Sequence, residues 1–123
     1  MCYCGTDIPY DSCCQPLHRY QKKAKTAEQL MRSRYSAFVV ADEQYLQFTH
    51  HRSTFTADLY ANLARSNPKW LRLQVLESQE KGSQAWVSFK AYYLEDGIEK
   101  ALAEHSRFVR KGGHWQYVDG EFF

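Results

Sequence analysis

The chain has 123 residues, of which 44% are hydrophobic, 15% aromatic and 24% charged. This length and apolar content suffice for one buried core, which excludes a globally disordered protein. No apolar run approaches the roughly 20 residues of a membrane-spanning helix, and the start lacks the pattern of a secretion signal. The net charge of +2 is far from the basic excess of a dedicated nucleic-acid binder. We expect a soluble, cytoplasmic protein that neither inserts into membranes nor takes nucleic acid as its partner.

All four cysteines lie within the first 14 residues, in a turn-rich segment without helical or strand periodicity. Disulfides are disfavoured in a reducing compartment, and clustered thiols in so short a segment are typical of a structural zinc site. We predict that Zn²⁺ binds Cys2, Cys4, Cys13 and Cys14. Redox chemistry at the adjacent Cys13 and Cys14 is the alternative. His18, which follows closely, is expected to make a packing contact, with metal ligation as its alternative role.

A basic connector is expected over residues 15–25, followed by a helix over 27–40. The spacing of Thr26 and Gln29 is that of a capping box, and apolar residues then recur at helical intervals. Asp42 is predicted to cap a short second helix. That helix carries Tyr45, Leu46 and Phe48.

A third helix is predicted to begin at Thr56 or Asp58 and to stop at Asn67-Pro68. Its apolar residues are Leu59, Tyr60, Leu63 and Ala64. From Trp70 onward, apolar and polar residues alternate with a period of two, which predicts strands. The turns expected between the strands are at Lys81-Gly82, Asp96-Gly97 and Lys111-Gly112-Gly113. Helices followed by an antiparallel meander predict an α+β domain with the helices on one face of a curved sheet.

The strand predicted over residues 98–110 mixes charged and apolar residues on both faces. If the sheet curls around a cavity, Glu104 or Arg107 would point inward and give an apolar pocket with a few convergent polar groups. The alternative is a structural arginine–carboxylate pair that braces helix against sheet. The candidate pocket residues are Arg34, Tyr35, Tyr45, His50, Glu104, Arg107 and Tyr117.

Two other groups of polar residues are candidates for a functional role. His50 and His51 lie at a predicted helix end, where a solvated or dipole-facing histidine is favoured over a catalytic one. The basic residues near the cysteines favour an ordinary solvated face over a site for phosphate or an acidic partner. These basic residues are Lys22, Lys23, Lys25, Arg32 and Arg34.

The cysteine segment resembles the SEC-C motif, a zinc-binding knuckle also found at the C-terminus of the SecA translocation ATPase. The matching residues are Cys2-Tyr-Cys4-Gly5, Tyr10-x-x-Cys13-Cys14 and Pro16-Leu-His18. The rest of the chain resembles the YchJ-like family of uncharacterised bacterial proteins. The residues that carry this resemblance are Leu30-Met-Arg-Ser-Arg-Tyr-Ser-Ala-Phe38, Tyr45-Leu46, Thr49, Trp70-Leu71, Ser106-Arg107-Phe108, Trp115 and Tyr117-Val-Asp-Gly120.

The resemblance implies a SEC-C zinc knuckle at residues 1–20 and a nuclear transport factor 2-like (NTF2-like) domain at residues 21–123. In that fold three helices pack on a curved antiparallel sheet and form a cone with an internal cavity. The resemblance also implies a ligand role for each cysteine and pairing of two chains through their sheets. Some family members end with a second SEC-C motif, whereas no cysteine follows Cys14 here.

Our leading functional hypothesis is a non-enzymatic, zinc-stabilised binding module. Its knuckle contacts a protein partner, and its cone offers a pocket for a small ligand. One alternative is a small enzyme of the hydratase, isomerase or hydrolase type that uses the cone cavity. The second alternative is a thiol redox protein acting through Cys13 and Cys14.

Overall fold

Two of the predicted helices are confirmed in the computed structural model, which describes residues 1–123. The longer helix, α2 (Ala27–Val39), begins where Thr26 Oγ1 accepts a hydrogen bond from the amide of Gln29 at 3.0 Å. The next helix, α3 (Glu43–Phe48), begins where Asp42 accepts one from the amide of Tyr45 at 3.0 Å. Both caps satisfy an amide that has no partner inside its own helix.

The predicted third helix is wrong except for its last turn, α4 (Leu63–Ser66). Asn62 has a left-handed φ of 69°, which interrupts the helix that the sequence pattern predicts. The Thr56 hydroxyl donates to the Asp58 carboxylate at 2.8 Å, so neither residue caps a helix. The connector also differs from its prediction, because it begins with a one-turn helix, α1 (Gln15–His18).

The second half of the chain forms one antiparallel sheet in the order β1-β2-β3-β4. Its strands are β1 (Lys69–Lys81), β2 (Gln84–Glu95), β3 (Ile98–Lys111) and β4 (His114–Phe122). All three predicted turns are confirmed. At the β2–β3 turn, Asp96 and Gly97 have φ values of 53° and 75°, the positive values that a two-residue type I′ turn requires.

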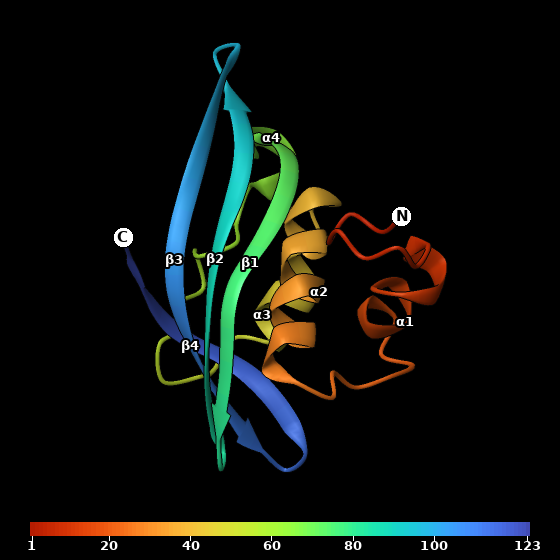
Figure 1. Cartoon of the computed structure of the whole chain (residues 1–123), viewed down its shortest axis with the longest axis vertical. Helices are drawn as coiled ribbons and strands as arrows, with labels where there is room; N and C mark the ends of the chain where they lie inside the picture. Colours follow the sequence, from red (N-terminus) through yellow and green to blue (C-terminus); the bar gives the residue numbers. More distant parts are fainter.

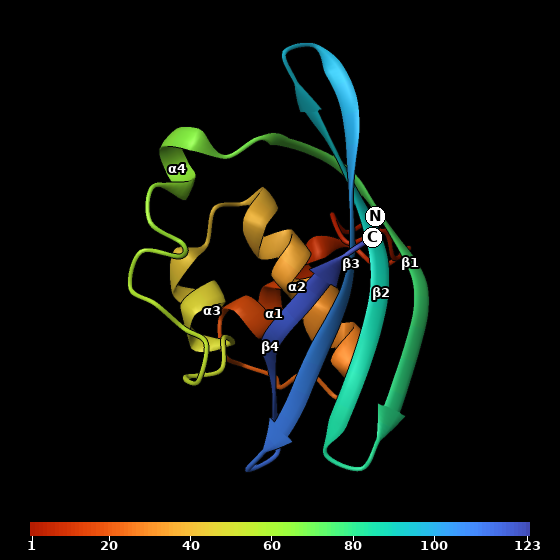
Figure 2. The ribbon, with the colours of Figure 1, turned by 90° about the vertical axis from the view of Figure 1, so that its left-hand side faces the viewer.

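The sheet curves around the helices, and α2 is the helix that packs on it (Figures 1 and 2). Register shifts in β1 and between β3 and β4 mark the bulges that help to bend the strands. The core between α2 and the sheet consists of Ala27, Leu30, Met31, Ala85, Val87, Phe108 and Trp115. The helix α3 packs on α2. The predicted α+β architecture is therefore confirmed, and no helix is long and apolar enough to cross a membrane.

The N-terminal segment packs against the rest of the molecule and lies beside α2 (Figure 1). Leu17 of α1 is buried in a second core cluster together with Ala37, Tyr45, Leu46 and Tyr60. Arg32 Nη1 of α2 donates to the carbonyl oxygen of Cys4 at 2.7 Å. A shared hydrophobic core therefore crosses the predicted boundary between residues 20 and 21.

Candidate functional site

The four cysteines converge at one end of the N-terminal segment, with their sulfur atoms all within 4.8 Å of one another. Cys2 and Cys4 lie in a tight turn, residues 2–5, in which the Gly5 amide donates to the carbonyl oxygen of Cys2 at 3.1 Å. Gly5 has a φ of 95°, a conformation that residues with a side chain rarely adopt. Cys13 and Cys14 lie where a 3-10 turn meets α1. Two local turns thus bring all four thiols together.

The geometry of this cluster fits a tetrahedral zinc ion. The Sγ atoms of Cys4 and Cys13 are 3.8 Å apart. Two thiolates at about 2.3 Å from a tetrahedral Zn²⁺ are separated by about 3.8 Å. The Thr6 hydroxyl lies 3.2 Å from Cys13 Sγ, and the Ser36 hydroxyl lies 3.7 Å from Cys2 Sγ. Such hydroxyls can donate hydrogen bonds to thiolates and hold them in place.

The ionisation of the four thiols is unequal in the protein chain alone. Hydrogen bonding to Cys14 lowers the pKa of the Cys4 thiol to about 4. The same contact, together with burial, raises the pKa of Cys14, and burial raises the pKa of Cys13. Four thiolates this close repel one another, so full ionisation requires a bound cation.

His18 of α1 and Tyr45 of α3 pack together beside α2, and both bond to Ser33 of that helix. His18 Nε2 donates to the carbonyl oxygen of Ser33 at 2.8 Å, so its Nδ1 accepts from the hydroxyl of Tyr10 at 2.8 Å. Both ring nitrogens are thus engaged, as expected for the packing role. The His18 ring packs on Tyr45, with centroids 4.7 Å apart. Tyr45, a predicted pocket residue, therefore lies between α1 and α2 and not in the cone.

A second candidate site is a cavity of about 420 Å³ between α2 and the concave face of the sheet. Its volume lies in the range of small-molecule sites. Its wall is largely aromatic and includes Phe38, Trp70, Phe89 and Phe108. Five of the seven predicted pocket residues line it: Arg34, Tyr35, His50, Glu104 and Tyr117.

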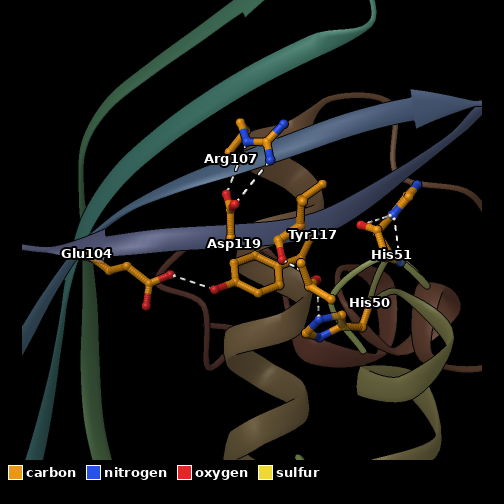
Figure 3. A network of polar contacts seen from close by, with 9 residues as sticks. His50, His51, Glu104, Arg107, Tyr117 and Asp119 are labelled. Atoms are coloured by element: carbon orange, nitrogen blue, oxygen red, sulfur yellow. Dashed lines mark hydrogen bonds and ion pairs between the residues drawn. The ribbon is translucent and has the colours of Figure 1, made fainter. Parts of the chain in front are cut away.

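Arg107 is the other predicted pocket residue that lies elsewhere. Because side chains alternate along β3, Glu104 faces the cavity and Arg107 lies on the opposite face of the sheet. Arg107 pairs there with Asp119 of β4 at 3.1 Å, and both side chains are substantially exposed (Figure 3). The expected arginine–carboxylate pair thus exists, but it joins two strands on the outer surface.

Arg34 is a buried cation in the wall of the cavity and is only 6% exposed. Its Nη1 donates to the carbonyl oxygen of Leu46 at 2.9 Å and to Thr49 Oγ1 at 2.7 Å. Its Nη2 donates to the Tyr60 hydroxyl at 2.6 Å. The guanidinium also lies over the ring of Tyr117, 4.8 Å from the centroid. None of these partners is a carboxylate, and Arg34 forms no ion pair.

His50 is fixed in one tautomer by its neighbours. Thr54 Oγ1 donates to the carbonyl oxygen of Val118, so it accepts from His50 Nε2 at 2.9 Å. His50 Nδ1 therefore accepts from the Tyr60 hydroxyl at 2.5 Å, which itself accepts from Arg34. Burial, and then the charge of Arg34, lower the pKa of His50 to about 4. His50 is 7% exposed, so of the two predicted roles, solvated or dipole-facing, the solvated one is wrong for this residue.

Glu104 lies at the phenolic end of Tyr117. Its Oε2 accepts a hydrogen bond from the Tyr117 hydroxyl at 3.1 Å (Figure 3). The same oxygen accepts one from Ser106 Oγ at 2.5 Å. Burial, and then the charge of Glu104, raise the pKa of Tyr117. A Cβ atom at Gly120 would clash with the Glu104 side chain, so a glycine there leaves room for the carboxylate. The bridge between His50 and Tyr117 brings β4 to the end of α3.

Sequence reasoning missed the role of Tyr60, which it placed on a helix as a packing residue. Tyr60 joins Arg34 to His50 through its hydroxyl, yet it lies in the irregular segment before α4. No periodicity marks such a residue. Gly120 was noted only as part of the family resemblance, and its contact with Glu104 gives it a physical reason.

Known proteins resemble this chain along nearly its whole length. Residues 26–120 match the family described as YchJ, middle NTF2-like domain. A UPF0225 protein of Vibrio parahaemolyticus is 41% identical over 125 residues, which cover 98% of this chain and 74% of that protein. The UPF0225 protein YchJ of Shigella dysenteriae is 41% identical over 124 residues, covering 98% and 82%.

Two solved structures are also similar. The solution structure of a SEC-C motif containing protein from Rhodopseudomonas palustris has a TM-score of 0.89 and 35% identity, covering 98% of this chain and 96% of that one. The crystal structure of a SEC-C motif containing protein from Psychrobacter arcticus has a TM-score of 0.81 and 31% identity, covering 97% and 80%. The fold is thus α+β and NTF2-like, and the chain belongs to the YchJ-like family, also called UPF0225.

Proposed function

We propose that this protein is a zinc-stabilised binding protein whose cone cavity holds a small ligand. The observation that carries the proposal is the cavity of about 420 Å³ between α2 and the concave face of the sheet. In most domains side chains fill the space between a helix and the sheet on which it packs. Its aromatic wall and its few polar groups, Arg34 and Glu104 among them, are typical of a ligand site.

The zinc ion has a structural role in this proposal. Four thiolates would fill its coordination shell and leave no position for a substrate. The segment that it would stabilise contributes Leu17 to the core and receives a hydrogen bond from Arg32. A disulfide between Cys13 and Cys14 would remove two of the four ligands, so the zinc site and the redox alternative exclude each other.

Binding is favoured over catalysis by the hydrogen bonds of the cavity. A general base needs a lone pair that can reach the substrate. Both nitrogens of His50 are already engaged, with Tyr60 and Thr54. At Glu104, Oε2 accepts from Tyr117 and Ser106, which leaves Oε1 to accept a hydrogen bond from a ligand.

Native mass spectrometry after incubation with a metabolite extract tests the ligand. The variant Ala91→Phe narrows the cavity, because Ala91 lines it and is 3% exposed. The matched control is Ala101→Phe, at an exposed position on β3. The wild type and the control should retain a bound mass that Ala91→Phe lacks. A bound mass that all three proteins retain equally, or that none shows, contradicts the proposal.

A second candidate function, docking of a protein partner through the zinc knuckle, is supported by exposed apolar side chains. Met1, Tyr3 and Ile8 are 81%, 49% and 49% exposed. A photo-crosslinking residue at position 3 should capture one cellular protein, and Ile8→Ser should abolish the capture. The same crosslinker at Tyr92, on the sheet, is the control. Equal capture from both positions contradicts docking through the knuckle.

A further inference from the structure

The side chain of Arg34 is a buried cation that forms no ion pair. Burying a cation is costly unless an opposite charge or a set of strong acceptors compensates for the lost water. Arg34 is only 6% exposed. The groups that accept its hydrogen bonds are one carbonyl and two hydroxyl groups, and all three are neutral. The Tyr117 ring adds a cation–π contact at 4.8 Å. The positive charge itself therefore has no counter-charge in direct contact with it.

The unused donors of Arg34 define where an anion would bind. A guanidinium has five N–H groups, and three of them account for the hydrogen bonds to Leu46, Thr49 and Tyr60. The two that remain are Nε–H and one N–H of Nη2. Nε and Nη2 share one edge of the guanidinium, and Nε–H has no partner there. Such an edge binds the oxygens of a carboxylate.

Glu104 supplies the opposite charge, but Tyr117 separates it from Arg34. Arg34 lies over the face of the Tyr117 ring, whereas Glu104 accepts a hydrogen bond from the hydroxyl at the end of that ring. Glu104 forms no ion pair with any residue. Its other hydrogen bond, from Ser106, also comes from a neutral group. The cavity thus holds an unpaired cation and an unpaired carboxylate with an aromatic wall around them.

We infer that the ligand of this cavity is a small aromatic or similarly flat apolar acid. Its anionic group binds the free edge of Arg34, and a hydrogen-bond donor at its other end binds Glu104. The apolar body packs on the rings of the wall, which include Phe89 and Phe108. This inference rests on the proposed ligand-binding function and specifies the chemistry of the ligand.

Three probe compounds of similar size test this chemistry by isothermal titration of the zinc-loaded, full-length protein. Para-hydroxyphenylacetate has the acid and the donor, phenylacetate has the acid alone, and para-hydroxyphenylethanol has the donor but no charge. We expect para-hydroxyphenylacetate to bind most tightly. Both acids should bind at least about tenfold more tightly than the neutral alcohol, because a buried charge-assisted hydrogen bond is strong.

Variants then assign each end of the ligand. Arg34→Met should abolish the preference for acids, and Arg107→Met, on the outer face, should leave it unchanged. Glu104→Gln should reduce the advantage of para-hydroxyphenylacetate over phenylacetate by a few-fold. The comparison of the three probes on the wild type needs no variant, so a folding defect in Arg34→Met does not remove the test.

The outcomes test separately whether the cavity binds a ligand and whether that ligand is an acid. If the neutral alcohol binds the wild type as tightly as the acids, the inference about the anion is wrong, while ligand binding in the cavity stands. If the acids bind Ala91→Phe as tightly as the wild type, they bind outside the cavity and the inference is also wrong. If no probe binds at millimolar concentration, the inference fails, whereas the bound mass in the metabolite experiment tests the proposed function independently.

Discussion

Tyr60 connects Arg34 to His50 in the wall of the cavity, because its hydroxyl accepts from Arg34 and donates to His50. Tyr60→Phe leaves a buried Nη2–H and the Nδ1 of His50 without this partner. We expect a loss of about 1–3 kcal/mol in the free energy of unfolding, measured by urea denaturation. The control is Tyr92→Phe, which removes a hydroxyl that bonds Gln74 on the exposed surface and should change stability by less than about 0.5 kcal/mol. Equal effects of the two variants would contradict the role assigned to Tyr60.

His50 makes stability depend on pH in a defined window. Its pKa is lowered from 6.5 to about 4 in the folded protein, so between these values the unfolded chain binds more protons. The neutral His50 side chain therefore contributes its full stabilisation of the folded protein above pH 6.5, and this stabilisation is lost as the pH falls toward 4. We expect this loss to be about 3 kcal/mol. His50→Asn should flatten the stability profile between pH 6.5 and 4, whereas His51→Asn, at the neighbouring position, should not. A profile of His50→Asn parallel to that of the wild type would show that another group titrates.

Individual site residues differ in how far the sequence predicts them. The four cysteines lie close together in the chain, so local turns suffice to join them and their clustering is visible in the sequence. The assignment of Glu104 and Arg107 to opposite faces follows from strand alternation, but which face is inside depends on the side that α2 covers. Tyr60 has no such local signal, because tertiary contacts determine the path of its segment.

The cap of α2 at Thr26 should contribute measurably to the stability of the protein. Thr26→Ala removes the acceptor of the Gln29 amide, and we expect a loss of about 1 kcal/mol in stability. Thr56→Ala is the matched control, since Thr56 is exposed and its side chain bonds only to Asp58. Its effect should stay within about 0.5 kcal/mol. Thermal and urea unfolding measure both variants. A larger effect at Thr56 would mean that this residue organises the segment before α4.

The elements themselves were largely predictable. Helices with a cap and a clear period, and strands separated by glycine turns, agree with their predictions because local interactions specify them. The third helix differs, because Asn62 takes a left-handed conformation and Tyr60 turns toward Arg34. There a tertiary network outweighs helix propensity. The one-turn α1 is too short for a periodic signal.

Pairing of two chains through their sheets stays a prediction. The outer face carries exposed cross-strand ion pairs, Arg72 with Glu99 and Arg107 with Asp119. An interface on this face would be polar, so a dimer should dissociate more readily at high salt. Light scattering over a range of protein and salt concentrations measures this. A mass equal to one chain under all conditions would contradict pairing.

For the whole molecule, the zinc site and the core should be coupled. Metal binding releases the thiol protons and fixes the N-terminal turns, and these turns hold Leu17 in the core cluster that also contains Tyr45 and Leu46. We expect about one zinc per chain and four thiols that react only after chelation. Chelation should also lower the unfolding temperature and expose apolar surface that binds a hydrophobic dye.

Two variants distinguish the stabilisation that comes from zinc binding from the stabilisation that comes from the packing of Leu17. Cys4→Ser should lower the unfolding temperature by itself, and chelator should then have little further effect. Leu17→Ala should keep the zinc yet cost about 2–5 kcal/mol, because it leaves a cavity between α1 and α2. If chelation left the unfolding temperature unchanged, the turns around the cysteines would be stable alone. Removal of residues 1–20 would then expose only the patch beneath Leu17, and the remaining chain should fold with a lower stability. If chelation destabilises the chain as expected, the N-terminal segment and the cone form one cooperative unit, because the same helix, α2, contacts both.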